Sequence, residues 1–119
     1  MIRIDLPWPP RELHPNARGH WKKRYRMAKA CRSLGAGLTL TAGVRRDDPD
    51  IPQDLKVTAI FYPPDNRRRD LDGMLSSIKS YLDGIADVIG VDDSKWQLGA
   101  PRKEKPVKGG LVRIELEAA

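Results

Sequence analysis

Apolar and polar residues alternate near both ends of the chain. The first segment reads Ile2-Arg-Ile-Asp-Leu6 and the last reads Leu111-Val-Arg-Ile-Glu-Leu116. A period of two places the apolar side chains on one face of a half-buried strand. A third segment, residues 55–62, is rich in β-branched and aromatic residues and ends at Pro63-Pro64, as expected of a central strand. The pattern therefore predicts three strands.

Between these strands, apolar residues recur at helical spacing. From position 71 to 89 they follow steps of three and four residues, at Leu71, Met74, Leu75, Ile78, Tyr81, Leu82, Ile85, Val88 and Ile89. This pattern predicts an amphipathic helix, and Gly90 is placed to end it. A less regular segment from Arg18 to about Leu40 contains few helix breakers, so we expect a second helix there.

The remaining segments complete a small α+β fold. Residues 45–54 hold two prolines and four acids and predict a loop, 94–98 predict a strand, and 101–110 form a basic loop before the last strand. The order β-α-β-α-β-β predicts one domain over residues 1–119, with a mixed four-stranded sheet covered on one face by two helices. A length of 119 residues suits one domain.

Composition narrows the class of protein. No apolar run approaches the roughly 20 residues that span a bilayer, and the N-terminal residues lack the apolar stretch of a secretory signal. Cys31, the only cysteine, has no disulfide or zinc-binding partner, and we expect it to be a small core residue in a reducing compartment. We therefore expect a soluble cytoplasmic protein with no membrane partner.

The charge is unevenly distributed. The chain has 22 Lys and Arg against 16 Asp and Glu, a net charge of +6. Residues 11–32 alone carry a charge of +7 and residues 102–108 carry +3, whereas residues 83–93 carry −4. Three basic stretches, counting Arg67-Arg-Arg69, favour a partner rich in phosphate, such as a nucleic acid. A solvated helix face is the alternative interpretation of any one such stretch.

The aromatic residues and histidines add little to this signal. Trp8, Trp21, Tyr25 and Trp96 could stack on bases, but in a chain with only seven aromatics we expect them in the core. His14 and His20 could carry protons, but we expect both to be ordinary surface residues.

The most informative stretch is Asn66-Arg-Arg-Arg-Asp-Leu-Asp72. If the backbone is extended there, Asp70 and Asp72 project to one side, about 6.5–7 Å apart, with Leu71 turned into the core. Two carboxylates at that separation suit a metal ion. The alternative is structural, with Asp72 capping the next helix and Asp70 paired with an arginine.

A second acidic pair, Asp92-Asp93, follows the 71–89 helix. Residues 73–89 would span roughly 25 Å as a helix, so the two pairs meet only if the chain folds back or a second subunit contributes. A polar turn is the alternative interpretation. Aspartates without Cys or His ligands suit Mg²⁺ or Mn²⁺. A metal ion beside the run Arg67-Arg-Arg69 would suit phosphodiester hydrolysis, with a metal-bound water as the attacking group.

The order of these motifs resembles the RusA family of Holliday junction resolvases. The resemblance covers nearly the whole chain: Leu6-Pro-Trp-Pro-Pro10, a basic helix, Arg67-Arg-Arg-Asp-Leu-Asp72, Gly90-Val-Asp-Asp-Ser94 and Lys105-Pro-Val-Lys-Gly-Gly110. It implies a homodimer that binds four-way DNA junctions and makes paired symmetric nicks with Mg²⁺ or Mn²⁺.

The resemblance also implies roles for individual residues. Asp70 and Asp72 match the paired catalytic and metal-binding carboxylates, and Asp93 matches the third, with Asp92 as the other possible register. Two positions depart from the family pattern: Gly73 stands where an asparagine is common, and Ser76 stands where a functional lysine is expected. Lys79 lies three residues further along, and we expect it to replace that lysine as a catalytic residue.

The leading hypothesis is therefore a metal-dependent, structure-selective endodeoxyribonuclease. The residues expected to bind DNA are Arg67, Arg68, Arg69, Lys22, Lys23, Arg24, Arg26, Lys105 and Lys108. A catalytically silent branched-DNA-binding module of the same fold is the alternative, and a basic domain for an acidic protein partner is a third possibility.

Overall fold

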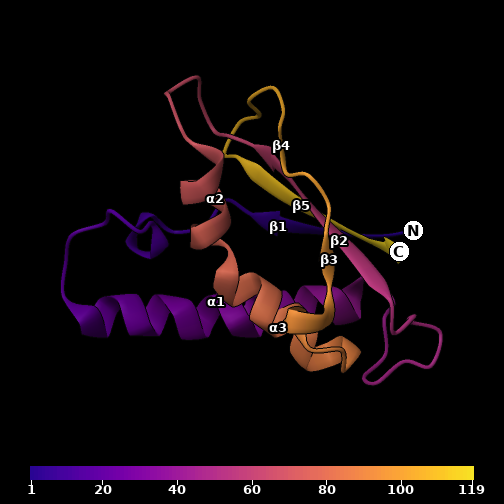
Figure 1. The fold of residues 1–119 in the computed structure, drawn as a ribbon. Helices are drawn as coiled ribbons and strands as arrows, with labels where there is room; N and C mark the ends of the chain where they lie inside the picture. Colours follow the sequence, from indigo (N-terminus) through magenta and orange to yellow (C-terminus); the bar gives the residue numbers. More distant parts are fainter.

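The computed structural model describes all 119 residues and is built on one mixed sheet (Figure 1). Strand β5 (Leu111–Ala118) lies between β1 (Ile2–Pro7) and β2 (Leu55–Tyr62) and is antiparallel to both. The far edge of β2 pairs in parallel with two short strands, β3 (Gln97–Leu98) and β4 (Arg102–Lys103). The predicted α+β class is confirmed, with five strands in place of four.

The alternation seen in the sequence sets the two faces of the sheet. Ile114 of β5 pairs with Ile4 on one side and with Ala59 on the other, and all three are buried. The intervening residues lie on the opposite face, where Arg113 donates to Asp5 with nitrogen to oxygen distances of 2.7 and 3.0 Å. One face therefore forms the core, and the other is polar along β1 and β5 but includes the buried Ile60 of the central strand β2.

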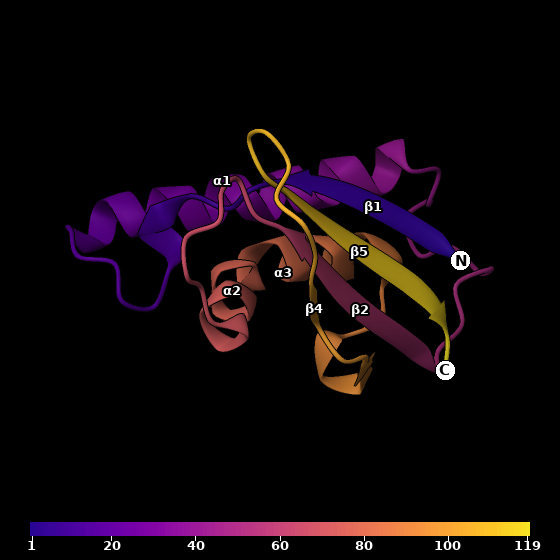
Figure 2. The ribbon, with the colours of Figure 1, turned by 90° about the horizontal axis from the view of Figure 1, so that it is seen from above.

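Three helices and two short 3₁₀ turns connect the strands. The α-helices are α1 (Trp21–Thr41), α2 (Leu71–Ser77) and α3 (Lys79–Ile89). The 3₁₀ turns are η1 (Arg11–Leu13) and η2 (Asp93–Lys95). Figures 1 and 2 show the helices gathered on one face of the sheet, as predicted. No helix is long and apolar enough to cross a membrane.

The predicted helix over 71–89 is divided at Ile78. This residue has φ −103° and ψ 7°, outside helical geometry, and is completely buried. The Ser77 hydroxyl donates to the Met74 carbonyl at 2.7 Å and competes with the regular helical pattern. The apolar stripe continues across the break, so the periodicity gave the buried face correctly but not the change of direction.

The strand predicted over 94–98 is also partly wrong. Residues 93–95 form η2, and only the last two residues of the predicted strand pair with β2. The loop predicted over 101–110 contributes β4. Such short edge strands carry too few residues for a pattern of alternation to be visible in the sequence.

Helices α1 and α3 pack closely through two glycines. A Cβ atom added at Gly35 would lie 2.5 Å from the Tyr81 carbonyl oxygen, and one added at Gly84 would overlap the Arg32 carbonyl oxygen. The absence of side chains at these positions lets the backbones approach. Arg32 also forms a bidentate ion pair with Asp87 across this contact, at 2.7 and 2.8 Å.

The first half of α1 extends beyond α3 as a separate arm (Figure 1). Trp21 and Tyr25 are 67% and 62% exposed there, so the prediction that they belong to the core is wrong. Trp96 does lie in the core, and half-buried Trp8 packs edge-on against Phe61. We call residues 11–30, comprising η1, the following loop and this half of α1, the basic arm.

Candidate functional site

The carboxylate pair lies at the start of α2. Asp70 is extended, with φ −93° and ψ 151°, and its side chain accepts a hydrogen bond from the Gly73 amide as the N-cap. Because the helix begins at Leu71, the extended geometry expected through Asp72 does not hold. Asp72 is exposed in the first turn, and Leu71 is 37% exposed. The capping role expected of Asp72 therefore belongs to Asp70, and Leu71 does not turn into the core.

Arg69 is used to hold the loop before α2. Its Nη1 donates to the Asp65 carboxylate at 2.8 Å and to the carbonyl oxygens of Asp65 and Arg67, both at 3.2 Å. Its guanidinium also lies 5.5 Å from the centre of the Trp8 ring. These contacts hold the pKa of Asp65 below its usual value, first through the hydrogen bond from Arg69. Arg67 and Arg68 remain exposed.

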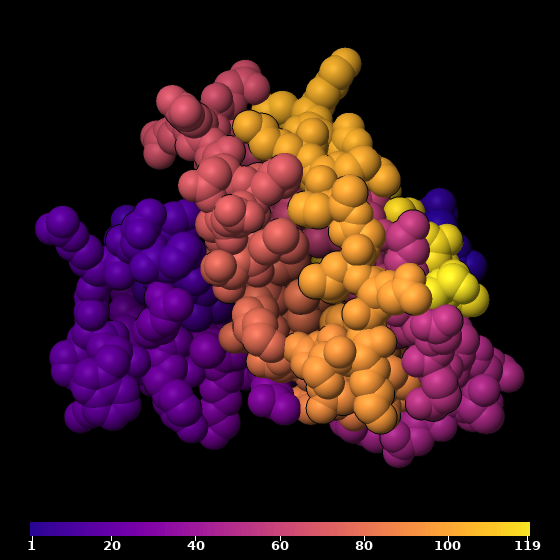
Figure 3. Space-filling model, in the orientation of Figure 1, coloured from indigo at the N-terminus to yellow at the C-terminus, as the bar shows by residue number.

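A second basic loop lies beside the first. The Val107 amide donates to the Pro63 carbonyl at 2.9 Å, which brings the 104–110 loop against the segment that leads to Arg67. Figure 3 shows both loops together at the top of the molecule. Lys105 and Lys108 are exposed on this second loop. The structure thus brings together two of the three basic stretches, next to the start of α2.

Asp93 folds back along α3 and meets Lys79. The Lys79 ammonium donates to Asp93 at 2.7 Å and to Asp83 at 3.0 Å. These two carboxylates raise the pKa of Lys79, with the Asp93 hydrogen bond as the larger cause. Asp92 instead accepts from the Ser94 amide at 2.9 Å and caps η2. Asp92 and Asp93 were the two candidates for the third carboxylate. Of these, Asp93 is the one that contacts the predicted site residue Lys79.

The three predicted metal ligands do not converge within one chain. No three His, Cys, Asp or Glu side chains in the structure are placed to hold one metal ion. Asp70 and Asp72 lie at the start of α2, whereas Asp93 lies in η2, after α3, and its carboxylate pairs with Lys79. Lys79 itself directly follows the break at Ile78.

His14 lies next to Asp70, which the sequence did not indicate. A Cβ atom added at Gly73 would lie 2.7 Å from Nε2 of His14 and 2.7 Å from Oδ1 of Asp70. The Asn16 amide donates to Nδ1 of His14 at 3.1 Å, so in the neutral ring the proton is on Nε2. His14 is half-buried, not fully exposed, and its expected lack of a functional role stays a prediction. The only sequence signal was the glycine at position 73, which leaves room for the imidazole.

The basic arm is held together by its own charged residues. Nη1 of Arg24 donates to the carbonyl oxygens of Glu12 and His14 at 3.0 and 3.1 Å, and Lys23 pairs with the Glu12 carboxylate at 3.2 Å. These contacts fix η1 against α1. Of the four arm residues expected to bind DNA, two therefore have internal partners. The other two, Lys22 and Arg26, are exposed.

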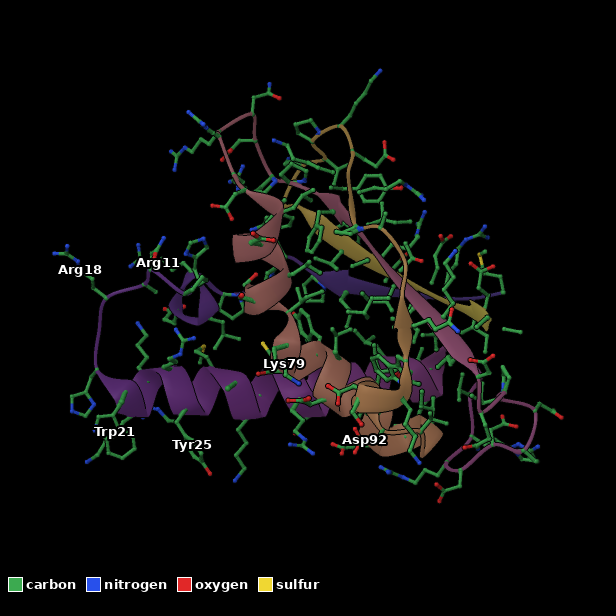
Figure 4. All side chains as sticks on the ribbon, viewed as in Figure 1. Arg11, Arg18, Trp21, Tyr25, Lys79 and Asp92 are labelled. Atoms are coloured by element: carbon green, nitrogen blue, oxygen red, sulfur yellow. The ribbon has the colours of Figure 1, made fainter.

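A cavity of about 680 Å³ opens between η1 and the start of α1. Its lining includes four cationic residues, both histidines and a single carboxylate, namely Arg11, Arg18, Lys23, Arg24, His14, His20 and Glu12. Figure 4 shows Arg11 and Arg18 on one side of α1 and Trp21 and Tyr25 on the other. The arm thus presents a cationic concavity, which Trp21 also lines, and both Trp21 and Tyr25 are exposed.

Comparison with known proteins identifies one relative without assigning a function. The chain is 38% identical over 96 residues to an uncharacterized protein of Xylella fastidiosa strain Temecula1. The match covers 81% of this chain and 63% of the relative, so the chain spans less than two thirds of that protein's length. No family model matches the chain.

Proposed function

We propose that the protein is a metal-dependent, structure-selective endodeoxyribonuclease that nicks branched DNA, as the resemblance to the RusA family implies. The observation that carries the proposal is the exposed start of α2. There Asp70 and Asp72 lie next to two cationic loops, and His14 of the basic arm lies close to Asp70. Acidic residues surrounded by cations are what cleavage of a polyanion requires, because the cations offset repulsion between carboxylate and phosphate.

The cationic loops would position the DNA. Arg67, Arg68, Lys105 and Lys108 are exposed on adjacent loops and would bind backbone phosphates on one side of the cut. Arg69 would contribute indirectly, because its guanidinium holds the 65–69 loop in shape. The basic arm would bind a further length of DNA through Lys22 and Arg26.

The donor chemistry of Asp70 and Asp72 suits Mg²⁺, with Mn²⁺ as a substitute. Mg²⁺ is commonly held by one or two carboxylates together with water and substrate phosphates, so the pair does not need Asp93 as a direct ligand. When bound, Mg²⁺ would stabilise negative charge on the phosphate and lower the pKa of the attacking water. The residues themselves would hold and orient the reacting groups, with Asp70 fixed by its hydrogen bond from Gly73.

Lys79 would take the role of the lysine absent at Ser76. Its ammonium is charged at neutral pH, since Asp93 and Asp83 raise its pKa. It would place a positive charge beside the bound phosphate while holding Asp93 at the margin of the site. We further propose that the protein acts as a cytoplasmic homodimer, for which the exposed Trp21 and Tyr25 offer an apolar surface.

Substitution of Asp72 by asparagine tests the proposal. The Asp72→Asn variant should bind a four-way junction as tightly as the wild type or more tightly, because it removes negative charge beside the phosphates. It should lose nicking in Mg²⁺. Asp50→Asn, which removes the same charge from an exposed loop, should nick normally. Unchanged nicking by Asp72→Asn would contradict the assignment.

A branched-DNA-binding module without catalysis is the second candidate. It is favoured by one observation, the pairing of Asp93 with Lys79 at a distance from the other two carboxylates. This candidate predicts salt-sensitive junction binding with no nicking in Mg²⁺ or Mn²⁺. The two candidates are separated by incubating purified protein with labelled junction in each metal and in EDTA.

A further inference from the structure

We propose that the cavity between η1 and the start of α1 binds a phosphate group of the DNA strand that leads to Asp70. The cavity is large enough for a phosphate with its neighbouring sugar, at about 680 Å³. The ligand class follows from the charge of the lining. The position of the bound strand follows from His14, which lines the cavity and also lies close to Asp70.

Two of the lining cations are free to bind a ligand. Lys23 is paired with Glu12, and Arg24 is held by two carbonyl oxygens. No ion pair or side-chain hydrogen bond within the chain engages Arg11 or Arg18. Glu12, the only carboxylate that lines the cavity, is thus already paired with Lys23. The guanidinium groups of Arg11 and Arg18 remain without a counter-ion. Guanidinium groups are well suited to phosphate, which they bind through paired hydrogen bonds.

The backbone adds to the positive potential of the cavity. The first turn of α1, which begins at Trp21, contains no acidic residue, so the partial positive charge of the helix N-terminus is not offset. The His20 side chain caps this helix by accepting from the Lys22 amide at 3.2 Å. The helix start therefore reinforces the guanidinium groups instead of opposing them.

His14 connects the cavity to the start of α2. Its Nδ1 is occupied by the Asn16 amide, which leaves Nε2–H as a donor. Nε2 lies beside Gly73, on the same side of that residue as the Asp70 carboxylate. A phosphate in the cavity could thus be followed along the strand by a phosphate at Asp70, with the imidazole between them. Glycine at position 73 permits this arrangement, since a side chain there would displace the imidazole.

The identity of the ligand as DNA rests on the proposed function, whereas the phosphate chemistry rests on the cavity alone. Binding is therefore best measured without cleavage, in EDTA, with a short fluorescein-labelled duplex over a series of salt concentrations. Loss of the one phosphate that Arg11 and Arg18 hold together should reduce the slope of log K against log salt by about 0.9.

The test compares two double variants with equal loss of charge. Arg11→Ala/Arg18→Ala should bind more weakly and show the reduced slope. Arg45→Ala/Arg46→Ala, which removes two exposed arginines outside the cavity, should keep the wild-type slope. Equal changes in the two variants, or no change in the first, would overturn the proposal.

Nuclear magnetic resonance of His14 supplies a second readout. Addition of the unlabelled duplex should shift the Nε2–H signal of His14 in the wild type but not in Arg11→Ala/Arg18→Ala. A signal that stays in place with the wild type would overturn the proposal, even if the protein nicks DNA. Conversely, a shift in a protein that never nicks DNA would reject the nuclease function and retain the phosphate site.

Discussion

The close contact between α1 and α3 predicts a large effect of a single methyl group at Gly84. A Cβ atom there would lie 2.8 Å from the Ala36 amide nitrogen and 2.9 Å from the Arg32 carbonyl carbon, and it would overlap the Arg32 carbonyl oxygen. All three are backbone atoms, so no side chain can rotate to make room. The Gly84→Ala variant must therefore push the two helices apart.

Two opposing contributions set the magnitude. Alanine favours the helix over glycine by about 1 kcal/mol. Overpacking that displaces the backbone costs about 1–3 kcal/mol and sometimes more, and here the separation also loosens the buried residues Tyr81 and Ile85. We expect the free energy of unfolding to fall by about 2 kcal/mol, which corresponds to a decrease in Tm of about 8 °C for a domain of this size.

Gly37→Ala in α1 is the matched control. A Cβ atom at Gly37 meets nothing within 4 Å, so only the helix preference remains and the variant should be more stable by about 0.5–1 kcal/mol. Thermal unfolding followed by circular dichroism measures both variants against the wild type. If Gly84→Ala is as stable as the wild type while Gly37→Ala behaves as expected, the close packing of α1 and α3 is refuted.

Three further predictions concern other contacts. Burial raises the pKa of the Cys31 thiol, so it should react with Ellman's reagent only after unfolding; rapid reaction of the native protein would contradict its burial. The pKa of Asp5 is lowered chiefly by the hydrogen bond from Arg113. This pair therefore stabilises the fold above the usual pKa of an aspartate and less as pH falls through the lowered value. Asp5→Asn should cost about 0.5 kcal/mol at neutral pH and little at strongly acidic pH, whereas an equal loss at both pH values in denaturant titrations would contradict the pairing. Arg69→Ala should lower the free energy of unfolding by about 1.5 kcal/mol, as measured in urea titrations. Arg68→Ala should leave stability unchanged and weaken DNA binding. The reverse result would make Arg68 the structural residue and Arg69 the DNA-binding one.

The sequence was sufficient for the elements that bury long regular faces. β2 begins and ends where its β-branched and aromatic residues predict, and β5 extends only slightly beyond the predicted strand. The apolar stripe also gave the buried face of α2 and α3 from Met74 to Ile89, although its first member, Leu71, is exposed. Burial of a repeating pattern is a local consequence of periodicity, so it can be predicted without knowledge of the tertiary structure.

The rest of the fold depends on contacts between distant residues. Trp21 and Tyr25 follow helical spacing, yet they are exposed because α1 continues beyond the elements that could cover it. Periodicity gives the face of a helix but not the length of its neighbours. The break at Ile78 likewise arises where the chain changes direction over the core, which composition does not encode.

The candidate site shows the same division. Its residue types were predictable, because the aspartates and arginines stand in short local motifs. Their partners were not predictable: Arg69 turned to Asp65 and Trp8, Asp93 turned to Lys79, and His14 lies beside Asp70 through a tertiary contact. The roles proposed for Asp70, Asp72, Asp93 and Mg²⁺ remain predictions.

The most direct test of the central claim is cleavage of a four-way junction by the wild-type protein. Labelled junction and matched linear duplex are incubated with Mg²⁺ or with EDTA, and the products are mapped on each strand. The account predicts paired nicks, symmetrically placed in two strands of the same polarity, only in the junction and only with Mg²⁺. An intact junction in Mg²⁺ and Mn²⁺, under conditions in which the protein binds it, would contradict the account.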